Sequence, residues 1–358
     1  MTLYMGAPSA RPGGCEIYRG NLPMHFLKEE GHWDTAWEYF ANVYGSFMKH
    51  GLGFLAELFK RYQIFIFPRM FIPAHQHDEV LAAILQYFDM IHSFGGLVVW
   101  ETDDDYTNTH RQVIDGDIDS LLPFVDAVTV TTPQLRDLIG SLTDAPTYVL
   151  PNMLPPTWRQ INNHERLSDK LVIGLSGSTT HYNDWLVLEP VVEHLLKDFG
   201  DQILFVCAGF LPDYLKDYDV TFIPGLPYDQ YTELIKCFDI VLAPVDPQDQ
   251  FNNYKSPIKA LEGMGALRMV DGQRMGAAVI ASDNSVYRLA IEQERNGLLV
   301  EHTSAAWYDA IAYLVTHRRE RLQYQRNGYR WVWKNHDISK TWRLWQTAYR
   351  DAFMKKGN

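Results

Sequence analysis

The sequence of 358 residues lacks long apolar runs and contains few cysteines. It has no uninterrupted apolar run of about 18 residues, the length that a membrane-spanning helix requires. Its first residues lack a basic region followed by an apolar stretch, so we expect no signal peptide. The three cysteines, Cys15, Cys207 and Cys237, have no metal-ligand spacing and cannot all pair in disulfides. We therefore expect a cytoplasmic protein in which Cys207 and Cys237 are buried thiols.

An excess of basic charge is also absent. The chain has a formal net charge of −12, and nine basic against nineteen acidic residues give residues 1–150 a net charge of −10. A broad nucleic-acid groove needs a positive surface, so the charge argues against such a groove in the first half. A local basic patch remains compatible with this composition.

Short apolar runs alternate with helix-like stretches along most of the chain, which is typical of an α/β protein with buried parallel strands. The length is sufficient for two domains, and a hydrophobic content of 46% can supply two cores. Residues 33–62 are rich in aromatics and are predicted to be helical. The predicted strands include residues 2–5, 63–67, 97–101 and 127–131, then 171–177, 203–207, 220–223, 239–245 and 277–282.

The stretch 252–262, NNYKSPIKALE, lies between two of these strands. Ser256 is predicted to be the N-cap of a helix that begins at Pro257. In a strand–loop–helix–strand unit, the loop after the first strand meets the N-terminus of the helix. Backbone N–H groups and the helix dipole make such a position favourable for an anion.

Three charged residues accompany this helix. Lys255 precedes it, whereas Lys259 and Glu262 are three residues apart and therefore neighbours on one face. Lysines near phosphates, with a carboxylate one turn further on that accepts from sugar hydroxyls, would suit a nucleoside diphosphate. The alternative interpretation is an ordinary solvated helix face.

Two glycine-containing turns offer backbone donors to phosphate. One follows the first strand and includes Gly13 and Gly14; the other precedes Ser178. Neither has the spacing of a dinucleotide-binding motif, so an ordinary flexible turn is the alternative for the first. For His181, which follows the second turn, the alternative is helix capping or packing.

Three consecutive carboxylates, Asp103, Asp104 and Asp105, follow the strand at 97–101, where α/β sheets place ligands. They could bind a divalent metal, bind an acceptor hydroxyl and take its proton, or stabilise a helix N-terminus. His110 is nearby in the sequence and is a further candidate for the same site.

The segment from Gly265 to Ala277 and the basic stretch 317–330 have no evident role. The first is longer than a tight helix-to-strand turn. The second could bind an anionic partner or form a solvated helix, and its arginines are Arg318, Arg319, Arg321, Arg326 and Arg330.

Several motifs resemble the C-terminal half of retaining GT-B glycosyltransferases of the family 4 type. They are DIVLAPVDPQDQFNNYKSPIKALE followed by AAVIAS, RNGLLVEHTSAAWYDAI at 295–311 and IGLSGSTTHYND at 173–184. The resemblance covers roughly residues 150–350. It implies that Glu262 holds the ribose of a nucleotide sugar. Many members carry a second Glu eight residues earlier, which contacts the sugar, but this chain has Tyr254 there.

The resemblance implies two Rossmann-like domains with parallel sheets that face each other across a cleft. We expect an acceptor domain at 1–152, a donor domain at 153–335 and a C-terminal helix at 336–358 that crosses back to the first domain. The acidic run would then serve the acceptor, with Asp104, Asp105 and His110 as candidate catalytic residues. The expected donor-binding residues are Gly13, Gly14, Arg19, Ser178, Thr179, His181, Asp184, Lys255, Ser256, Lys259 and Glu262.

The implied activity is transfer of a hexose or pentose from a UDP- or GDP-sugar to an acceptor hydroxyl with retention of configuration. The fold generally works without a metal, so we expect neither a metal nor a cofactor besides the nucleotide-sugar co-substrate. A saccharide or glycan precursor is the expected acceptor. Three alternatives stay open: a virus-type transferase acting on a hydroxylated DNA base, a nucleotide-sugar epimerase, and a non-catalytic nucleotide-sugar-binding protein.

Overall fold

The computed structural model describes residues 1–7, 14–39, 49, 52–69, 72–73, 77–107, 116–161 and 166–356. The chain forms two compact units, each built on its own sheet. Unit 1 consists of Met1–Met153, Tyr254–Ser256 and Ile338–Asn358. Unit 2 consists of Leu154–Asn253 and Pro257–Asp337. The chain therefore enters unit 1 three times.

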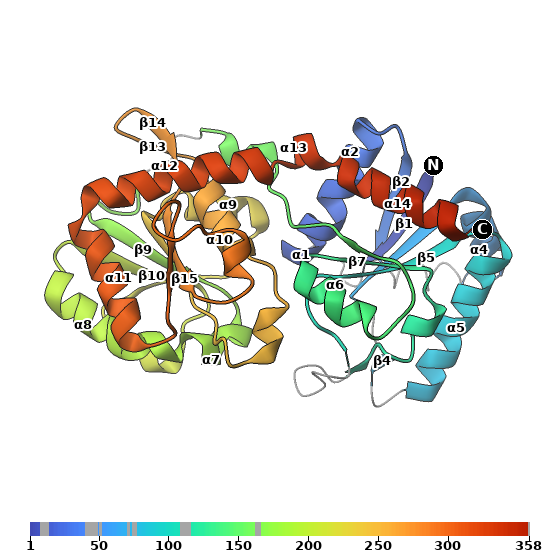
Figure 1. The fold of residues 1–358 in the computed structure, drawn as a ribbon, viewed down its shortest axis with the longest axis horizontal. Coiled ribbons are helices and arrows are strands. Elements are labelled where there is room, and N and C mark those ends of the chain that lie inside the picture. Colours follow the sequence, from blue (N-terminus) through green and yellow to red (C-terminus); the bar gives the residue numbers. More distant parts are fainter. Residues whose placement is uncertain are drawn as a thin grey trace. The chain divides into compact units, whose positions relative to one another are not determined.

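Unit 1 contains a parallel sheet with the strand order β2-β1-β3-β5-β7-β8 (Figure 1). The central strands are fully buried, as their continuous apolar runs predict. The strands are β1 (Thr2–Ala7), β2 (Asp34–Tyr39), β3 (Ile64–Pro68), β5 (Leu97–Thr102), β7 (Ala127–Val130) and β8 (Thr147–Val149).

The prediction of a helical segment over residues 33–62 is wrong in its first part. Strand β2 occupies Asp34–Tyr39, and helix α4 begins only at Leu52. β2 is an edge strand that pairs in register with β1, with Thr2 opposite Asp34. Most of its residues are exposed or half-buried, so its sequence does not show the apolar run of a central strand.

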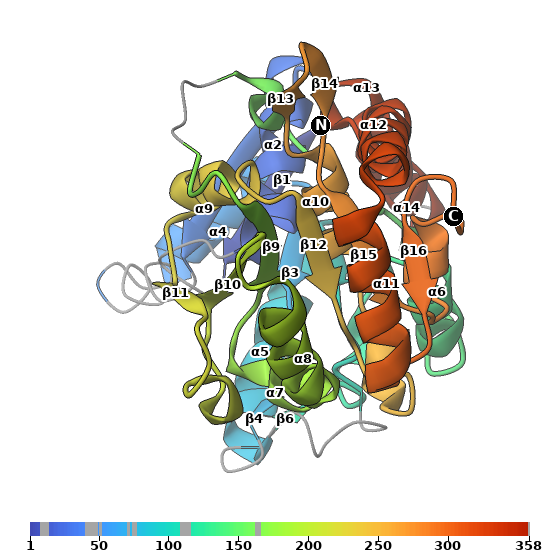
Figure 2. The same cartoon turned by 90° about the vertical axis from the view of Figure 1, so that its left-hand side faces the viewer.

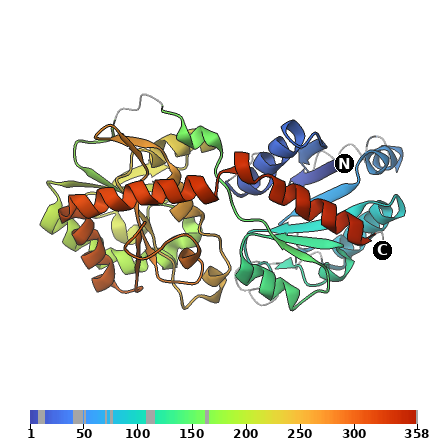
Figure 3. The same ribbon diagram turned by 45° about the horizontal axis from the view of Figure 1, so that its top comes forward.

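Helices cover both faces of the unit 1 sheet, and two hydrophobic clusters lie against it. The last helix, α14 (Arg343–Lys356), is the red helix that ends at the C-terminus in Figure 3, and it contacts α2 and β5. Its aromatic side chains Trp345 and Tyr349 are buried in one of these clusters. The other helices are α1 (Gly14–Glu16), η1 (Ile17–Asn21), α2 (Leu22–Glu29), α4 (Leu52–Arg61), α5 (His77–Ser93), η4 (Leu122–Phe124), α6 (Pro133–Gly140) and α13 (Ile338–Thr341).

Unit 2 contains a second parallel sheet, with the order β11-β10-β9-β12-β15-β16 (Figure 2). The strands are β9 (Leu171–Ser176), β10 (Ile203–Gly209), β11 (Thr221–Pro224), β12 (Ile240–Ala243), β15 (Ala278–Ser282) and β16 (Leu298–Val300). The prediction of an α/β protein with two parallel sheets is thus confirmed.

The helices of unit 2 include η6 (Thr179–His181), α7 (Tyr182–Trp185), α8 (Glu189–Phe199), α9 (Tyr228–Ile235), η9 (Gln250–Asn253), α10 (Ile258–Gly265), α11 (Ser304–Thr316) and α12 (Arg318–Asn335). Helix α10 packs tightly on the sheet, because a Cβ at Gly263 would lie 3.0 Å from Val241. The segment after α10 forms a hairpin of β13 (Arg268–Val270) and β14 (Gln273–Met275). Short antiparallel strands β4 (Ile72–Pro73) and β6 (Gly116–Asp117) pair in unit 1.

Helix α10 begins one residue later than predicted. Pro257 occupies the N-cap position, and Ser256, predicted to be the N-cap, lies outside the helix. No helix in the described part of the chain has both the length and the apolar character needed to cross a membrane.

Candidate functional site

Polar residues of unit 2 gather where its parallel strands end. Ser176 ends β9, Asp246 follows β12 by three residues, and Ser282 ends β15. Because parallel strands all end at the same edge, the segments after them lie together, and α/β sheets bind ligands at such edges. Two connected groups of side chains occupy this edge.

The first group, here called the Tyr231 cluster, consists of Ser176, Tyr231, Lys259 and Glu262. The Tyr231 hydroxyl donates to Glu262 Oε2 over 2.7 Å and lies 3.2 Å from Ser176 Oγ. Lys259 Nζ donates to the Tyr231 hydroxyl at 3.0 Å and reaches Glu262 Oε2 at 3.4 Å. Glu262 is only 4% exposed, and the two donors, Tyr231 and Lys259, hold its carboxyl group in place.

Burial and charge fix the protonation states of this cluster. Desolvation, with the nearby charge of Glu262, raises the pKa of Tyr231 to about 12, so Tyr231 remains a donor at neutral pH. Burial disfavours the charged form of Lys259, but Glu262 and Tyr231 outweigh it and raise the pKa of Lys259. The cluster therefore holds the Lys259 cation beside the Glu262 carboxyl group.

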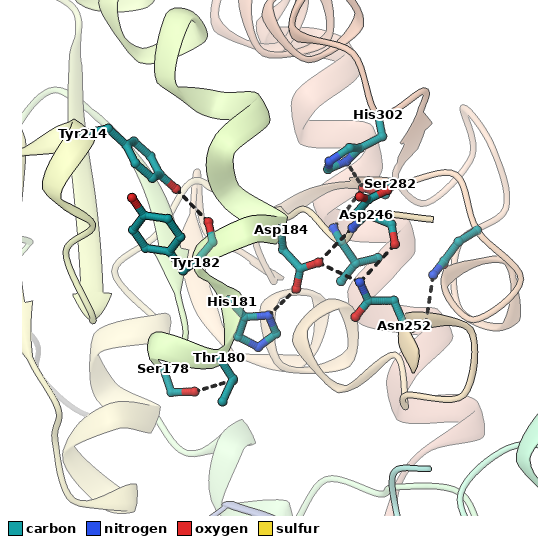
Figure 4. Close-up of polar contacts among 12 residues, drawn as sticks. Ser178, Thr180, His181, Tyr182, Asp184, Tyr214, Asp246, Asn252, Ser282 and His302 are labelled. Atoms are coloured by element: carbon teal, nitrogen blue, oxygen red, sulfur yellow. Dashed lines mark hydrogen bonds and ion pairs between the residues drawn. The ribbon is translucent and has the colours of Figure 1, made fainter. Parts of the chain in front are cut away.

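The second group, the Asp184 cluster, joins the segments that follow β9 and β12 (Figure 4). Asp184 Oδ1 accepts from Asp246 N at 2.9 Å and from Asn252 Nδ2 at 2.7 Å. Asp184 Oδ2 lies 2.9 Å from His181 Nδ1. Both oxygens of this buried carboxylate thus bind protein groups, and Asp184 positions His181 and the loop that contains Asn252.

His181 lies parallel to Trp185, with ring centroids 6.1 Å apart. A carboxylate at Nδ1 favours the tautomer that carries the proton on Nδ1. Glycine is required just before this turn, because a Cβ at Gly177 would approach both His181 and Trp185 to 2.8 Å. The neighbouring Ser178 and Thr179 are exposed at the sheet edge, and their backbone leads into η6.

The structure adds residues that the sequence did not single out. Ser282 Oγ accepts from Val245 N at 3.0 Å and lies 3.2 Å from His302 Nδ1. Desolvation lowers the pKa of His302, against the opposing effect of Asp246 and Asp184. The sequence gives no signal for the role of Tyr231, because its hydroxyl partners Ser176 and Glu262 lie on other elements far away in the chain.

The loop 254–256 belongs to unit 1 although it leads into α10. Tyr254 packs against the hydrophobic cluster of unit 1 that contains Phe67 and Trp100. Ser256 Oγ accepts from Asn152 Nδ2 over 2.8 Å. Tyr254, which stands where the resemblance would place a sugar-contacting Glu, thus packs within unit 1.

Arg19 also lies in unit 1, with a side chain that is 2% exposed. Its Nε donates to Glu101 Oε1 at 2.6 Å, and Nη1 donates to Leu150 O and to Asn152 Oδ1. Protein groups thus occupy Nε and Nη1 of this guanidinium and tie it to the segment after β8, and the donor-binding role of Arg19 stays a prediction. Gly14 is exposed at the start of α1, and Gly13 lies outside the described residues.

The acidic run follows β5 without forming a helix as far as Thr107, so the helix-start interpretation has no support in that range. Asp105 is fully buried, and its Oδ1 accepts from Thr107 N at 2.9 Å and Thr107 Oγ1 at 2.7 Å. These bonds hold one carboxylate oxygen of Asp105, and its candidate catalytic role stays a prediction. Asp104 is one-fifth exposed and lies 3.7 Å from Arg69 Nη2. His110 lies outside the described residues.

Asp104 has the most perturbed environment of the run. Desolvation and the neighbouring charge of Asp103 raise the pKa of Asp104 to about 7, although Arg69 and Lys255 oppose this shift. A carboxyl group that titrates near neutrality can take up a proton from a substrate hydroxyl. Among the described residues, no group of three or more His, Cys, Asp or Glu side chains could hold a metal ion.

Comparisons with solved structures identify the fold. The HepE protein of Anabaena, solved with UDP and glucose, matches with a TM-score of 0.66 at 12% identity, over 98% of this chain and 100% of that chain. A glycosyltransferase from Rickettsia africae matches with a TM-score of 0.65 at 12% identity, over 98% of both chains. The sucrose-phosphate synthase of Thermosynechococcus elongatus gives 0.64 at 12% identity, over 99% of both chains.

These neighbours are glycosyltransferases built on two Rossmann-like domains. The chain has the GT-B fold. No protein-family model matches the sequence, and no curated protein matches it either. The GT-B fold predicted from the motifs is confirmed, whereas the identities of the donor and acceptor sites stay predictions.

The raised pKa of Asp104 has a consequence for stability. The folded GT-B chain binds this proton more tightly than the unfolded chain, whose Asp pKa is about 3.9. Stability is therefore lost as pH rises from about 4 to about 7. Asp104→Asn should remove this loss and raise the free energy of unfolding at pH 8 by on the order of 1 kcal/mol, with a smaller gain at pH 5.

Urea denaturation at both pH values measures this difference. Asp213→Asn is the matched control, because the Asp213 side chain is 80% exposed. A variant at Asp104 that is less stable than the wild type at pH 8 would contradict the argument.

Proposed function

We propose that the protein is a retaining glycosyltransferase of the family 4 type that uses a UDP- or GDP-sugar. The observation that carries the proposal is the Tyr231 cluster, with Glu262 fixed at the carboxyl edge of a Rossmann-like sheet. A buried carboxyl group held in place by protein donors is suited to accept from vicinal hydroxyls, as the ribose of a nucleotide presents. HepE, which shares the fold, has been solved with UDP and with UDP-glucose.

The donor diphosphate would meet positive charge and backbone donors. Lys259 is charged at neutral pH, and Ser178 and Thr179 are exposed at the turn after β9. Lys255 and Ser256 stand in the loop that leads into α10, and their part in donor binding rests on the motif alone. During transfer, the bond between the anomeric carbon and the β-phosphate oxygen breaks, and negative charge grows on the leaving diphosphate. Fixed cations and N–H groups aimed at that charge lower the barrier.

The acceptor hydroxyl supplies the oxygen of the new glycosidic bond and must lose its proton. We assign the acceptor to the acidic run of unit 1, with Asp104 as the group that binds the hydroxyl or takes the proton. Its position after β5 and its pKa near 7 support this role. Asp105 supports the loop, and no side chain is assigned as a nucleophile. A saccharide or glycan precursor is the proposed acceptor class.

Mass spectrometry of reactions with panels of nucleotide sugars and acceptors tests the proposal. We expect release of nucleoside diphosphate only when an acceptor hydroxyl is present, and activity that survives EDTA because lysines rather than a metal meet the diphosphate. Isomer formation without acceptor would instead indicate an epimerase. Binding without turnover would indicate a non-catalytic protein, and transfer only to a hydroxylated DNA base would overturn the saccharide assignment.

Two carboxylate variants separate the donor and acceptor assignments. Glu262→Gln should weaken nucleotide binding by about 1–3 kcal/mol, the cost of a hydrogen bond to a charged group. Asp104→Asn should leave nucleotide affinity unchanged and lower kcat/KM for the acceptor. Calorimetry with UDP or GDP and acceptor titrations measure the two effects, with Glu193→Gln as an exposed control on α8. Unchanged nucleotide affinity in Glu262→Gln would remove Glu262 from the site.

A further inference from the structure

A cavity of about 260 Å³ lies in unit 2 at the edge opposite the Tyr231 and Asp184 clusters. Leu171 begins β9 and Asp239 directly precedes β12, so the cavity adjoins the amino ends of strands whose carboxyl ends carry the candidate donor site. Figure 1 shows the β13–β14 hairpin and α7 at opposite edges of this sheet. The lining residues are Arg166, Asp169, Leu171, Asp239, Val270, Arg318, Arg321, Leu322 and Gln325. We call it the amino-edge cavity.

The hairpin that follows α10 forms one wall of this cavity through Val270. Its turn residues Asp271 and Gly272 both have positive φ, 50° and 73°, which allows a two-residue connection. Arg318 Nη2 donates to Asp271 Oδ2 at 2.6 Å and anchors the turn to the first turn of α12. Arg268, on β13, forms an ion pair with Asp239. The long segment after α10 and the basic start of α12 thus build the cavity together.

Arg321 supplies a buried positive charge in the cavity wall. Its side chain is 9% exposed, and its hydrogen bonds go to the carbonyl oxygens of Leu314 and Val315 near the end of α11. In the described part of the chain, no carboxylate lies within ion-pair distance of it. Capping α11 explains the contacts of Nη1, but a buried guanidinium without a counter-ion is unfavourable unless an anion approaches it.

The remaining charges of the wall leave a positive surplus. Three arginines and two aspartates line the cavity. Of the aspartates, Asp239 pairs with Arg268 and lies 3.7 Å from Arg166, and Arg318 pairs with Asp271 outside the lining, so four arginines stand against three aspartates when these partners are included. Asp169 is exposed. The lining is therefore complementary to a small anion.

Gln325 adds a requirement for a hydrogen-bond donor. It is 1% exposed, and its Nε2 donates to Asp239 O at 2.8 Å. Its Oε1 has no hydrogen-bond partner among the residues that the structure describes. A buried acceptor left without a donor costs about 1–3 kcal/mol, so a ligand hydroxyl that reaches it would be favoured.

We propose that the amino-edge cavity binds a small hydroxylated phosphate monoester. The guanidinium groups of Arg318 and Arg321 bind the phosphate, because arginine matches phosphate geometry through paired N–H donors. A hydroxyl of the same molecule donates to Gln325 Oε1. The volume is below the roughly 300–1,000 Å³ of pockets for drug-sized ligands, which restricts the occupant to a few heavy atoms beyond the phosphate. This site is separate from the proposed donor site and does not depend on its assignment.

Titrations followed by methyl NMR test the proposal on the full chain, with glycerol 3-phosphate, inorganic phosphate and glycerol as probes. The methyl groups of Leu171, Val270 and Leu322 report on the cavity, and those of Val245 report on the donor edge. We expect glycerol 3-phosphate to shift the cavity methyls saturably and to bind about fivefold more tightly than phosphate, as one added hydrogen bond predicts. Glycerol alone should leave them unchanged.

Single substitutions test which side chains bind the phosphate and which one binds the hydroxyl. Arg318→Gln, at an exposed position, should weaken binding of both anions about tenfold, since it removes a charged hydrogen bond. Gln325→Met should abolish the preference for glycerol 3-phosphate over phosphate while phosphate still binds. Arg321→Gln removes the hydrogen bonds to α11 as well as the charge. In the folded variant, the binding of both anions should be weaker. Arg330→Gln, an exposed position further along α12, is the control and should change nothing.

Three results would overturn the proposal. The first is an absence of shifts at the cavity methyls with glycerol 3-phosphate. The second is a response confined to Val245, which would place the anion at the donor edge. The third is an Arg318→Gln variant with the affinity of the Arg330→Gln control.

Discussion

Parallel pairing of the strands is the constraint on which the candidate chemistry of this chain depends. In each six-stranded sheet every strand ends at the same edge, so residues far apart in sequence come together without any direct sequence signal. In unit 2 this brings the segments after β9, β12 and β15 into one hydrogen-bonded arrangement around Asp184. The same constraint separates the amino-edge cavity from the donor edge, because the amino ends of these strands lie on the other side of the sheet.

The sequence predicts the parts of the fold whose signal is local. Central strands such as β5 and β12 are continuous apolar runs, and both are fully buried. The sequence does not predict β2. This edge strand pairs with β1 on one side only, so it lacks the continuous apolar run of a central strand. The start of α10 was misplaced by one residue, since Ser256 bonds to Asn152 rather than capping the helix.

Site residues were harder to assign because their roles depend on partners distant in sequence. Glu262 could be singled out from its motif, but its partner Tyr231 lies 31 residues away on another helix. Arg19 was a donor-binding candidate by resemblance, and its side chain is buried in an ion pair with Glu101, 82 residues away in the sequence. Likewise, the sequence indicates no role for the hairpin after α10 or for the arginines of α12. The phosphate-binding role that we propose for them rests on the structure, which places both along the amino-edge cavity.

The most direct test of the donor assignment is a crystal structure of the protein with UDP bound. The account predicts that the ribose hydroxyls lie within hydrogen-bond distance of the Glu262 carboxylate, with the Tyr231 hydroxyl still donating to Oε2. It also predicts that the diphosphate lies beside Lys259 and the turn that contains Ser178. A nucleotide bound at any other edge of the unit 2 sheet, or a ribose without contact to Glu262, would contradict it.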